Sequence, residues 1–427
     1  MISGRYSLSV GNPRTPAPDG WRWTSLSDIA RLESGHTPSR RKPEYWDGNI
    51  PWIGIADATS NHGRTIYETF QTVSQAGVDN SSTRLLPEGT VCLSRTASVG
   101  FVVEMGRPMC TSQDFVNWVC SEHLNSQFLR YVLLSEHDSM MRFASGTTHQ
   151  TIYYPEAKAF HVCLPKLSEQ TRIAELLGSV DSKIEALENQ SENLSDLARA
   201  IFKSWFVDFD PVRAKAEGRE PEGMDAATAA LFPSEFRESV LGAIPAGWSI
   251  GRLDDLLVLQ RGFDLPHTQR TPGVYPVIAA SGPSGTHNEP RVKAPGVVTG
   301  RSGVIGKVYW VDDDFWPLNT SLWVKDFKRA TPAYAFQLLK LLDLPSYNAG
   351  SAVPTLNRNH VHGLPTLLPP ANIVRAFDEF ATTLYQRIHI NRKQSETLID
   401  LRDTLLPRLI SGKLRVPEAE KLLEAVL

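Results

Sequence analysis

Long apolar segments are missing from this sequence. It contains no run of eighteen apolar residues, and residues 1–20 are polar and rich in proline and glycine, without the apolar core of a signal peptide. A membrane-spanning helix needs about 20 mostly apolar residues, and a secretory signal needs a shorter apolar core. We therefore expect a cytoplasmic protein that makes no contact with a membrane.

Cysteine is also scarce. The four cysteines, Cys92, Cys110, Cys120 and Cys163, lie in the first half of the chain and form no CxxC pair. Structural zinc sites and disulfide frameworks need closely spaced or paired cysteines. The spacing predicts reduced, mostly buried thiols and no metal site.

An excess of basic residues is absent as well. Lysine and arginine number 44 against 47 aspartate and glutamate residues, which gives a formal net charge of −3. DNA-binding proteins usually carry a basic excess because they neutralise phosphates, so net charge does not point to nucleic acid. The 427 residues, 41% of them hydrophobic and 21% charged, indicate a globular protein of two or three domains.

Motifs of independent catalysis are missing too. Gly300–Val308 resembles a phosphate-binding loop, but Arg301 stands where that loop needs a glycine, and Val308 replaces the Ser or Thr that holds magnesium. Asp312–Asp314 and His360–His362 could each bind a metal, although a solvated turn and a polar loop are the favoured interpretations. No Asn/Asp-Pro-Pro-aromatic motif for adenine methylation is present. We expect no catalysis by this chain and no cofactor on it.

The sequence does contain a tandem duplication, which decides its architecture. Pro18–Trp21 reappears 227 residues later as Pro245–Trp248, and Arg95–Gly100 corresponds to Arg301–Gly306. Further matches, from Thr151 onward, lie at a constant spacing of 204 residues. The spacing between matching residues falls from 227 to 204 along the chain, which means that the second copy has shorter loops.

The first part of each copy, roughly 17–165 and 245–369, alternates short apolar runs with turn-forming residues. Examples are IPWIGI (50–55), GTVCLS (89–94), GVVTG (296–300) and SLWVKDF (321–327). Such runs predict strands, and brief helices are expected at Gln127–Leu134 and Ala333–Leu342. We expect two α/β domains of mixed topology, in an α+β or mixed fold.

The second part of each copy is predicted to be a long helix. Apolar residues there recur at alternating steps of four and three, which indicates a heptad seam. Asp208–Pro211 is expected to end the first helix, and Pro407 to kink or end the second. The first seam comprises Ile173, Leu177, Val180, Ile184, Leu187, Ser191, Leu194, Ala198, Ile201 and Trp205. The second comprises Phe377, Ala381, Leu384, Ile388, Leu398 and Leu405.

The duplication makes the two helices natural partners for each other. A helix of about 58 Å with one apolar seam is not stable alone. Because a globular domain lies between them in the chain, the helices can run antiparallel as a coiled coil. A generic dimerisation coiled coil is the alternative, which the domain–helix–domain–helix order disfavours. The predicted organisation is a tail (1–16), a domain (17–165), a helix (166–207), a connector (208–244), a domain (245–369), a helix (370–411) and a tail (412–427).

Several motifs in this order resemble the specificity subunits of type I restriction–modification systems, over residues 17–415. They are Ser34–Pro38, Tyr45–Ile53, Leu86–Val91, Leu164–Pro165 followed by Glu169–Ala174, Phe202–Pro211 and Leu406–Leu414. The second copy departs from the pattern, with Arg261–Asp264 in place of the Ser-Gly-x-Thr-Pro turn. It also has Ala371–Asn372 in place of Glu169–Gln170, so the contacts made by the two copies need not be equivalent.

The resemblance implies two target-recognition domains on helical spacers and a chain that binds double-stranded DNA. It also implies partners: methyltransferase (modification) subunits, expected to be two, and restriction (motor–nuclease) subunits. Those partners would use S-adenosylmethionine, ATP and magnesium. The alternative is a non-catalytic coiled-coil adaptor or scaffold protein without DNA specificity.

Candidate DNA-binding residues are the Arg, Lys, Asn, Gln, Thr and His side chains of the predicted loops, because such groups read base edges or hold phosphates. In the first domain they are Arg40, Arg41, Lys42, Asn61, Arg64, Arg95, Gln113, Thr147, Thr148, His149 and Gln150. In the second they are Arg261, Arg270, Arg301, Asn319, Asn357, Arg358, Asn359 and His360. Because Arg95 and Arg301 occupy repeated positions, we expect them to serve the DNA backbone or the structure rather than to read different bases.

The two domains also differ in charge. Residues 20–165 contain twelve basic and fourteen acidic residues, whereas residues 245–369 contain twelve basic and nine acidic residues.

We expect each domain to read its own half of an asymmetric target. The helices are expected to act as a ruler that limits the separation to about 17 base pairs, with half-site centres nearer one turn of about 10 base pairs.

Overall fold

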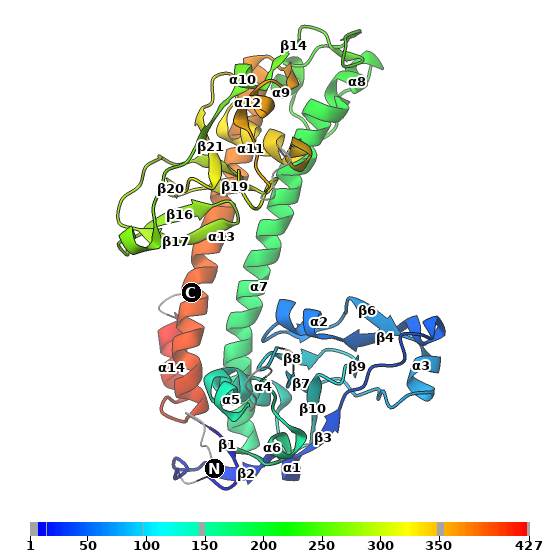
Figure 1. Ribbon diagram of the computed structural model, residues 1–427, viewed down its shortest axis with the longest axis vertical. Coiled ribbons are helices and arrows are strands. Elements are labelled where there is room, and N and C mark those ends of the chain that lie inside the picture. The colour runs from blue at the N-terminus through cyan, green and yellow to red at the C-terminus, as the bar shows by residue number, and fades with distance from the viewer. Residues whose placement is uncertain (1–6, 14, 97, 145–149, 348–353, 425–427) are drawn as a thin grey trace. The chain divides into compact units, whose positions relative to one another are not determined.

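The computed structural model describes residues 7–424 except 14, 97, 145–149 and 348–353. The chain forms two compact units. Unit 1 contains Met1–Ala186 and Ser395–Leu427, and unit 2 contains Leu187–Gln394. Each unit therefore holds one α/β domain together with segments of two long helices (Figure 1).

Each unit has a main sheet, and four strands follow the same order in both. In unit 1 the order is β3-β10-β7-β8-β5, with β3 at Ala30–Ser34, β10 at Phe115–Cys120, β7 at Val91–Ser94, β8 at Val102–Met105 and β5 at Thr65–Ile66. In unit 2 the order is β15-β21-β18-β19, with β15 at Val258–Arg261, β21 at Ser321–Asp326, β18 at Gly296–Gly300 and β19 at Val308–Val311. Helix α4 (Ser126–Ser135) packs on β7 and β8, and helix α11 (Pro332–Leu341) packs on β18 and β19. This cover explains why β7 and β18 are buried along their whole length.

A smaller sheet is also repeated. Its order is β6-β4-β9 in unit 1 and β17-β16-β20 in unit 2. In both, the middle strand pairs antiparallel with its first neighbour and parallel with its second. The bounds are Gln71–Val73 (β6), Trp46–Ile53 (β4), Cys110–Thr111 (β9), Gly282–His287 (β17), Tyr275–Ala279 (β16) and Trp316–Pro317 (β20).

A third sheet closes each domain near its long helix. It comprises β1-β11-β2 in unit 1 and β14-β22 in unit 2. Strand β1 (Leu8–Val10) lies in the segment expected to be an N-terminal tail, and it pairs with β11. The other bounds are Arg22–Ser25 (β2), Phe160–Leu164 (β11), Ser249–Arg252 (β14) and Pro365–Leu368 (β22).

Short helices occur at matching places in the two units. Helices α1 (Leu26–Ile29) and α6 (Tyr154–Lys158) of unit 1 correspond to α10 (Leu253–Leu256) and α12 (Arg358–His362) of unit 2. Unit 1 also has α2 (Ile55–Ser60), α3 (Gln75–Asp79), α5 (His137–Phe143) and a 3₁₀ turn at Pro43–Tyr45. Unit 2 has 3₁₀ turns at His267–Gln269 and Leu344–Tyr347.

The two long helices are α7 (Leu167–Lys203) and α13 (Ala371–Ile410). Helix α7 continues as a π-helical turn, Ser204–Asp208, and Phe209 then adopts a left-handed conformation with φ of 59°. The expectation that Pro407 kinks or ends the second helix was wrong about the end, because α13 runs on to Ile410. Proline removes one helical hydrogen bond there, while Leu405, Leu409 and Ile410 are all buried and hold the last turn in place.

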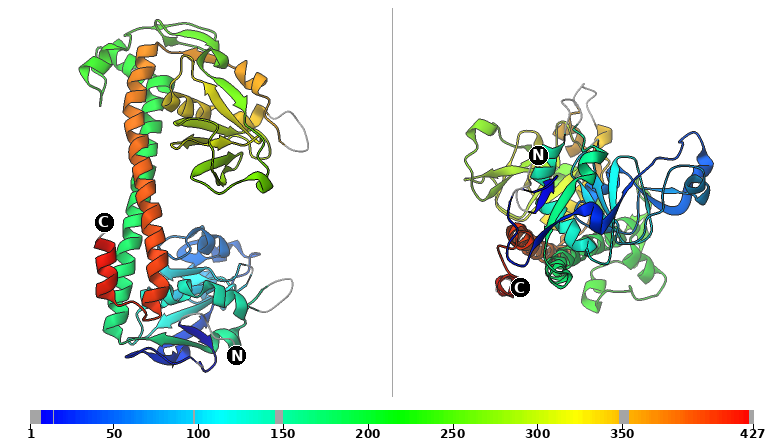
Figure 2. Two further views of the ribbon diagram at one scale, coloured as in Figure 1. Left: turned by 90° about the vertical axis from the view of Figure 1, so that its left-hand side faces the viewer. Right: turned by 90° about the horizontal axis from the view of Figure 1, so that it is seen from below.

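The heptad positions lie on the inner faces of these helices. Ile173, Leu177, Val180, Ile184, Leu187, Ala198, Phe377, Ala381, Leu398 and Leu405 are buried. Ser191, Leu194, Ile201, Trp205, Leu384 and Ile388 are half-buried. In unit 2 the two helix segments run antiparallel, because Asn391 contacts Gln190 while Phe377 contacts Phe202 (Figure 2). In unit 1, Arg402 of α13 contacts Asp181 of α7.

The segment expected to be a connector is structured and belongs to the core of unit 2. It contains α8 (Asp210–Ala216), α9 (Ala226–Ala230), β12 (Phe236–Arg237) and β13 (Ile244–Pro245). Val212 and Phe232 are buried in the same apolar cluster as Trp248. In the expected C-terminal tail, α14 (Val416–Glu424) forms and buries Val416, Ala419 and Leu423. None of the described helices combines the length and apolar character that a bilayer-spanning segment requires.

Candidate nucleic-acid interface

In each unit, loops from distant parts of the domain meet at one end of the main sheet. In unit 2 the loops after β15 and β18 meet the segments before β21 and α12; we call this the loop edge of unit 2. The amide of Arg301 donates to the carbonyl of Thr320 at 2.8 Å, and the amide of Leu356 donates to the carbonyl of Arg301 at 2.8 Å. At Gly262 an added Cβ would lie 2.3 Å from the carbonyl oxygen of Leu318, so only glycine allows this approach.

The loop edge of unit 1 has the same backbone plan. The amide of Arg95 donates to the carbonyl of Asp114 at 2.7 Å, and the amide of Ile152 donates to the carbonyl of Arg95 at 3.0 Å. A Cβ on Gly35 would lie 1.9 Å from the carbonyl oxygen of Ser112. The repeated glycine and the repeated arginine thus mark the same two backbone junctions, which supports a structural part for the main chain at Arg95 and Arg301.

The side chains that the two edges present are different. In unit 1 the hydroxyl of Thr37 donates to Oε1 of Gln113. At the matching place in unit 2, Nδ2 of Asn319 donates to Oδ1 of Asp264. Thr37 and Asp264 were not among the candidates, although each stands two residues after the repeated glycine, and this spacing could have identified them.

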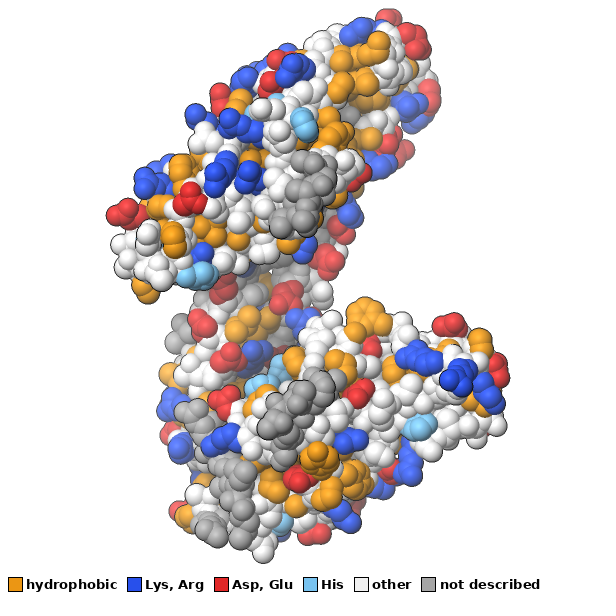
Figure 3. All heavy atoms as spheres, viewed as in Figure 1, with side chains coloured by type: hydrophobic (Ala, Val, Ile, Leu, Met, Phe, Trp, Pro, Cys, Tyr) orange, Lys and Arg blue, Asp and Glu red, His pale blue; other side chains and the backbone are white. Residues whose placement is uncertain are grey.

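Arginine dominates the edge of unit 2. Nε of Arg261 lies 3.4 Å from the carbonyl oxygen of Asn319, and a terminal nitrogen of Arg301 lies 3.5 Å from the same oxygen. Together with Arg358, Asn357 and Thr355 they line a pocket of about 470 Å³. Lys and Arg side chains are visible on the face of unit 2 in Figure 3. In unit 1, Nε of Arg95 is buried and has no hydrogen-bond partner among the described residues.

Other candidates in unit 1 lie away from this edge. Arg40 stacks on the ring of Trp46, 3.7 Å from its centre, and donates to Gln71 at 2.8 Å. Lys42 donates to the hydroxyl of Tyr45 at 3.0 Å, a hydrogen bond that raises the pKa of Lys42. Both side chains are exposed, as is Arg41, and the group lies around the start of the small sheet.

Two candidates have local structural contacts instead. The amide of Asn61 donates to the carbonyl of Asp57 at 2.8 Å, which closes the end of α2. Arg270 donates to the carbonyl of Ser284 at 2.5 Å and thereby ties a loop to β17. Arg64 is exposed, and its main-chain carbonyl accepts from the amide of Glu104.

The segment before α6 and α12 contains the remaining candidates. Thr147, Thr148 and His149 lie outside the described residues, and Gln150 is exposed. The side chain of Asn357 caps α12 by accepting from the amide of Asn359 at 3.0 Å. Arg358 and Asn359 are exposed.

At both possible metal sites, a candidate ligand side chain already contacts another group of the chain. The expected polar loop at His360–His362 is part of helix α12, and Nε2 of His362 accepts from the amide of Leu259 at 2.9 Å. Burial lowers the pKa of His362, which keeps this acceptor nitrogen free of a proton. Asp312 is not solvated as expected: its side chain is 14% exposed and pairs with His389 and Arg392. No cluster of three potential metal ligands occurs among the described residues.

All four cysteines are free thiols, as the spacing predicted. Three are buried and Cys120 is half-buried. Burial raises the pKa of Cys110 and of Cys120 to about 12, so neither thiol is an activated nucleophile. The loop at Gly300–Val308 leads from strand β18 to strand β19 rather than to a helix, unlike a phosphate-binding loop.

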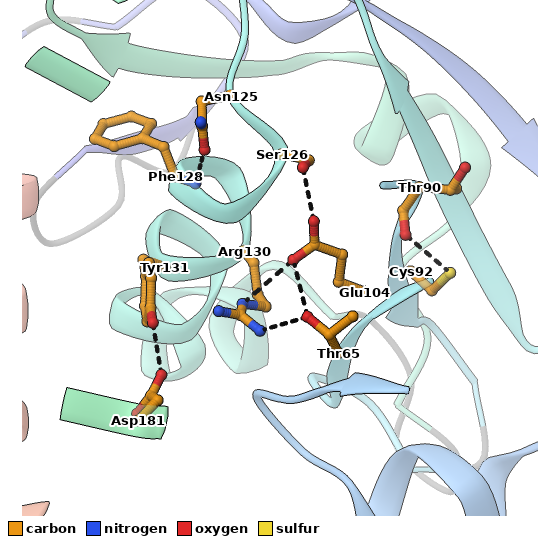
Figure 4. A network of polar contacts seen from close by, with 10 residues as sticks. All are labelled: Thr65, Thr90, Cys92, Glu104, Asn125, Ser126, Phe128, Arg130, Tyr131 and Asp181. Carbon is orange, nitrogen blue, oxygen red and sulfur yellow. Dashed lines mark hydrogen bonds and ion pairs between the residues drawn. The ribbon is translucent and has the colours of Figure 1, made fainter. Parts of the chain in front are cut away.

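In unit 1, polar contacts join helix α4 to strand β8 and to the long helix α7 (Figure 4). Arg130 on α4 forms a buried ion pair with Glu104 on β8 at 3.7 Å, and the hydroxyl of Ser126 donates to Glu104 at 2.6 Å. Next to it, the hydroxyl of Tyr131 donates to Asp181 on α7 at 2.6 Å. Asp181 also accepts from Arg402 on α13 at 2.9 Å.

Aromatic contacts attach the domain of unit 2 to its long helix at the same place in the repeat. Trp310 on β19 packs against Phe336 on α11, with ring centres 5.9 Å apart, and stacks on Tyr385 of α13 at 4.5 Å. The amide of Gln337 donates to the hydroxyl of Tyr385 at 2.7 Å. Each domain is thus fixed to a long helix through its own buried contacts.

Comparisons with known proteins agree with this architecture. The type I restriction enzyme MjaIX specificity subunit of Methanocaldococcus jannaschii is 27% identical over 431 aligned residues, which cover 94% of this chain and 95% of the relative. The HindI specificity subunit of Haemophilus influenzae is 22% identical over 477 residues, covering 92% of this chain and 99% of the relative.

A solved structure shares the fold. The crystal structure of the S subunit of a type I restriction–modification system from M. genitalium superposes with a TM-score of 0.59 at 16% identity, covering 91% of this chain and 96% of that one. The sequence also matches the family described as type I restriction modification DNA specificity domain, over residues 18–195 and 245–398. Because these two segments make up most of its length, the chain belongs to the family of DNA specificity subunits of type I restriction–modification systems.

Proposed function

We propose that this chain reads a two-part, asymmetric DNA target, with one domain for each half-site. The observation that carries the proposal is the pair of loop edges, which share one backbone plan and present different side chains. An amide group stands at the matching place in both, as Gln113 and as Asn319. Amide side chains can pair with base edges, and the amides of Gln113 and Asn319 have different partners, so the two edges should favour different half-sites.

An exchange of one domain tests this proposal. Residues 245–369 are replaced by the same region of a relative with another target, and the methylated sites are mapped with the assembled enzyme. We expect one half of the target to change and the other half to remain. The reciprocal replacement of residues 17–165 is the matched control, and it should change only the other half. A change in both halves, or in neither, would overturn independent reading.

We further propose that the lengths of α7 and α13 set the unread gap between the half-sites. Support comes from the buried contacts Tyr131–Asp181 and Gln337–Tyr385, because a domain fixed to a helix follows any change in that helix. One heptad added to both helices, after Leu187 and after Asn391, keeps the seam and adds about 10 Å, or about three base pairs. We expect the half-sites to stay fixed while the gap lengthens.

Two-residue insertions at the same places are the control for the gap. They rotate the seam away from its partner, so they should lower stability rather than lengthen the gap in proportion. An unchanged gap in the heptad variant would show that the helices do not set the spacing.

We also propose that the chain docks methyltransferase and restriction subunits and has no catalytic activity of its own. Membership of the family supports this proposal, and the side chains of Asp312 and His362 already pair with other groups of the chain. The purified chain should not methylate DNA when S-adenosylmethionine is supplied, whereas addition of the methyltransferase subunit should produce methylation. Methylation by the chain alone would contradict the proposal.

A further inference from the structure

The arginines at the loop edge of unit 2 have unused hydrogen-bonding capacity. Arg261 and Arg301 both approach the carbonyl oxygen of Asn319, at 3.4 and 3.5 Å, which is the long limit of a hydrogen bond. Each guanidinium has five N–H donors, so most remain available. The carboxylate of Asp264 lies 3.7 Å from Arg261, but its side chain is 71% exposed, and such surface pairs contribute little free energy.

A third arginine completes the site. Arg358 lines the same pocket of about 470 Å³, and its exposed side chain forms no hydrogen bond or ion pair with another described residue. Three guanidinium groups around a recess favour an oxyanion, because charge-assisted and bidentate hydrogen bonds to phosphate are strong. Reading a base edge would instead require side chains that project into a groove of the duplex.

The matching positions of unit 1 lack this concentration of charge. Ser34 stands in place of Arg261, Tyr154 in place of Arg358, and only Arg95 matches Arg301. The domains differ in the same direction, with twelve basic and nine acidic residues in 245–369 against twelve and fourteen in 20–165. The two loop edges are therefore unequal in their capacity to hold DNA phosphates.

We propose that Arg261, Arg301 and Arg358 bind one phosphate group of the DNA backbone, and that the loop edge of unit 2 thereby contributes more to the salt-dependent affinity than the loop edge of unit 1. The inference rests on the proposed DNA-reading function and adds that the two units contribute unequally to DNA affinity. Unit 2 anchors the duplex, whereas unit 1 contributes mainly base discrimination.

Salt-dependent binding by the full chain tests the inference. Dissociation constants are measured between about 50 and 200 mM salt, on a duplex carrying the mapped target and on a random duplex, for wild type, Arg301→Gln and Arg358→Gln. Each substitution should reduce the slope of log K against log salt, by up to the value of about 0.9 that loss of a whole phosphate contact would give. Both DNAs should lose affinity equally. The matched control, Arg95→Gln, should change the slope much less.

A chemical change in the DNA locates the contact. An uncharged methylphosphonate is placed at each backbone position of the half-site read by unit 2. One position should weaken binding by the wild-type chain and have a smaller effect on Arg358→Gln, which has already lost one of the three contacts to that phosphate. Retained thermal unfolding midpoints will show that the variants fold, as expected for an exposed side chain.

The outcomes are distinguishable. If Arg358→Gln leaves the slope unchanged but relaxes selection at one base pair, the residue reads a base and the phosphate site is overturned. If Arg95→Gln and Arg301→Gln reduce the slope equally, the unequal division is overturned. If the wild-type chain shows no preference for any sequence, the proposed function fails, while the slopes on random DNA still decide whether the pocket binds phosphate.

Discussion

Matched positions on the main sheet and on the helix that covers it carry ions in unit 1 and aromatic rings in unit 2. A spacing of 206 residues places Trp310 where unit 1 has Glu104, and Phe336 where unit 1 has Arg130. In unit 1 these positions form a buried ion pair whose side chains are only 5% and 6% exposed. In unit 2 they form a ring contact at 5.9 Å. The same arrangement of sheet and helix thus contains an ion pair in one unit and an aromatic contact in the other.

The difference matters because substitutions at the two contacts should lower stability for different reasons. Breaking a buried ion pair leaves one charge unpaired in a poorly solvated site, whereas replacing both charges by apolar groups of similar size is often tolerated. The contact between Trp310 and Phe336 contains no charged group, so changes to Phe336 should cost only lost packing. The two halves of the duplication therefore make a matched pair for mutational tests.

The largest effect is expected from Arg130→Met in unit 1. The substitution leaves Glu104 buried without its cation, and we expect the free energy of unfolding to fall by about 3–5 kcal/mol. Urea denaturation followed by far-UV circular dichroism measures the change. The double variant Arg130→Met/Glu104→Leu should recover most of that loss, because neither charge remains.

The matched variant in unit 2 is Phe336→Met, which leaves no polar group unpaired. It should cost less than Arg130→Met, of the order of 1 kcal/mol. If the double variant in unit 1 is as unstable as Arg130→Met alone, the ion pair is not the reason for the difference between the units.

An intermediate effect is expected from two hydrogen bonds at matched positions of the repeat, Gln337–Tyr385 in unit 2 and Tyr131–Asp181 in unit 1. Tyr385→Phe removes the acceptor of Gln337, a residue only 2% exposed, so a buried amide is left unsatisfied. We expect a loss of about 1–3 kcal/mol. Thermal and urea unfolding of the full chain measure it.

The counterpart in unit 1 should respond less. Tyr131→Phe removes a hydrogen bond to Asp181, but that carboxylate is 26% exposed and keeps its bond to Arg402. Water can take the place of the hydroxyl, so the loss should be about 0.5–1.5 kcal/mol. An equal loss in the two variants would contradict the idea that burial of the remaining partner sets the cost.

Sequence patterns predicted the parts of this molecule that depend on periodicity. The heptad positions, the duplicated domains and the brief helices at α4 and α11 follow from spacings that a chain must keep to bury an apolar face. The contacts at these matched positions could not be predicted in the same way. Glu104 and Arg130 are single charges in apolar runs, and only the packing of α4 on β8 makes them partners.

The sequence indicated which types of residue the candidate site contains, but not which of these residues lie together. Arg261, Arg301 and Arg358 come together because the end of β15, the loop after β18 and the start of α12 meet at one end of a sheet, which no local pattern indicates. Asn61 has the side-chain chemistry of a base-reading residue, and in the structure its amide closes helix α2. An asparagine that caps a helix and one that reads a base look alike in sequence, because both follow from the same short polar side chain.

The smallest effect is expected in the helix seam, where the copies again differ at a matched position. Asn391 is fully buried, and its Nδ2 donates to Gln190 at 2.9 Å and to Ser191 at 3.3 Å. Its Oδ1 has no hydrogen-bond partner among the described residues. The repeat spacing of 204 places Leu187 at the same position of the first copy, so one seam carries an apolar residue where the other carries an amide.

We expect Asn391→Leu to raise the free energy of unfolding by about 1 kcal/mol, because it removes an unsatisfied buried acceptor and two modest hydrogen bonds together. The more stable variant should also allow other alignments of the two helices, since a single polar seam residue disfavours such alignments in a coiled coil. Leu187→Asn, the reverse change at the matched position, should lower stability. Urea unfolding measures the first effect, and disulfide trapping between cysteines placed on α7 and α13 measures register. A variant that is more stable and still traps only the native cysteine pair would show that Asn391 does not specify alignment, and that the apolar positions around it suffice.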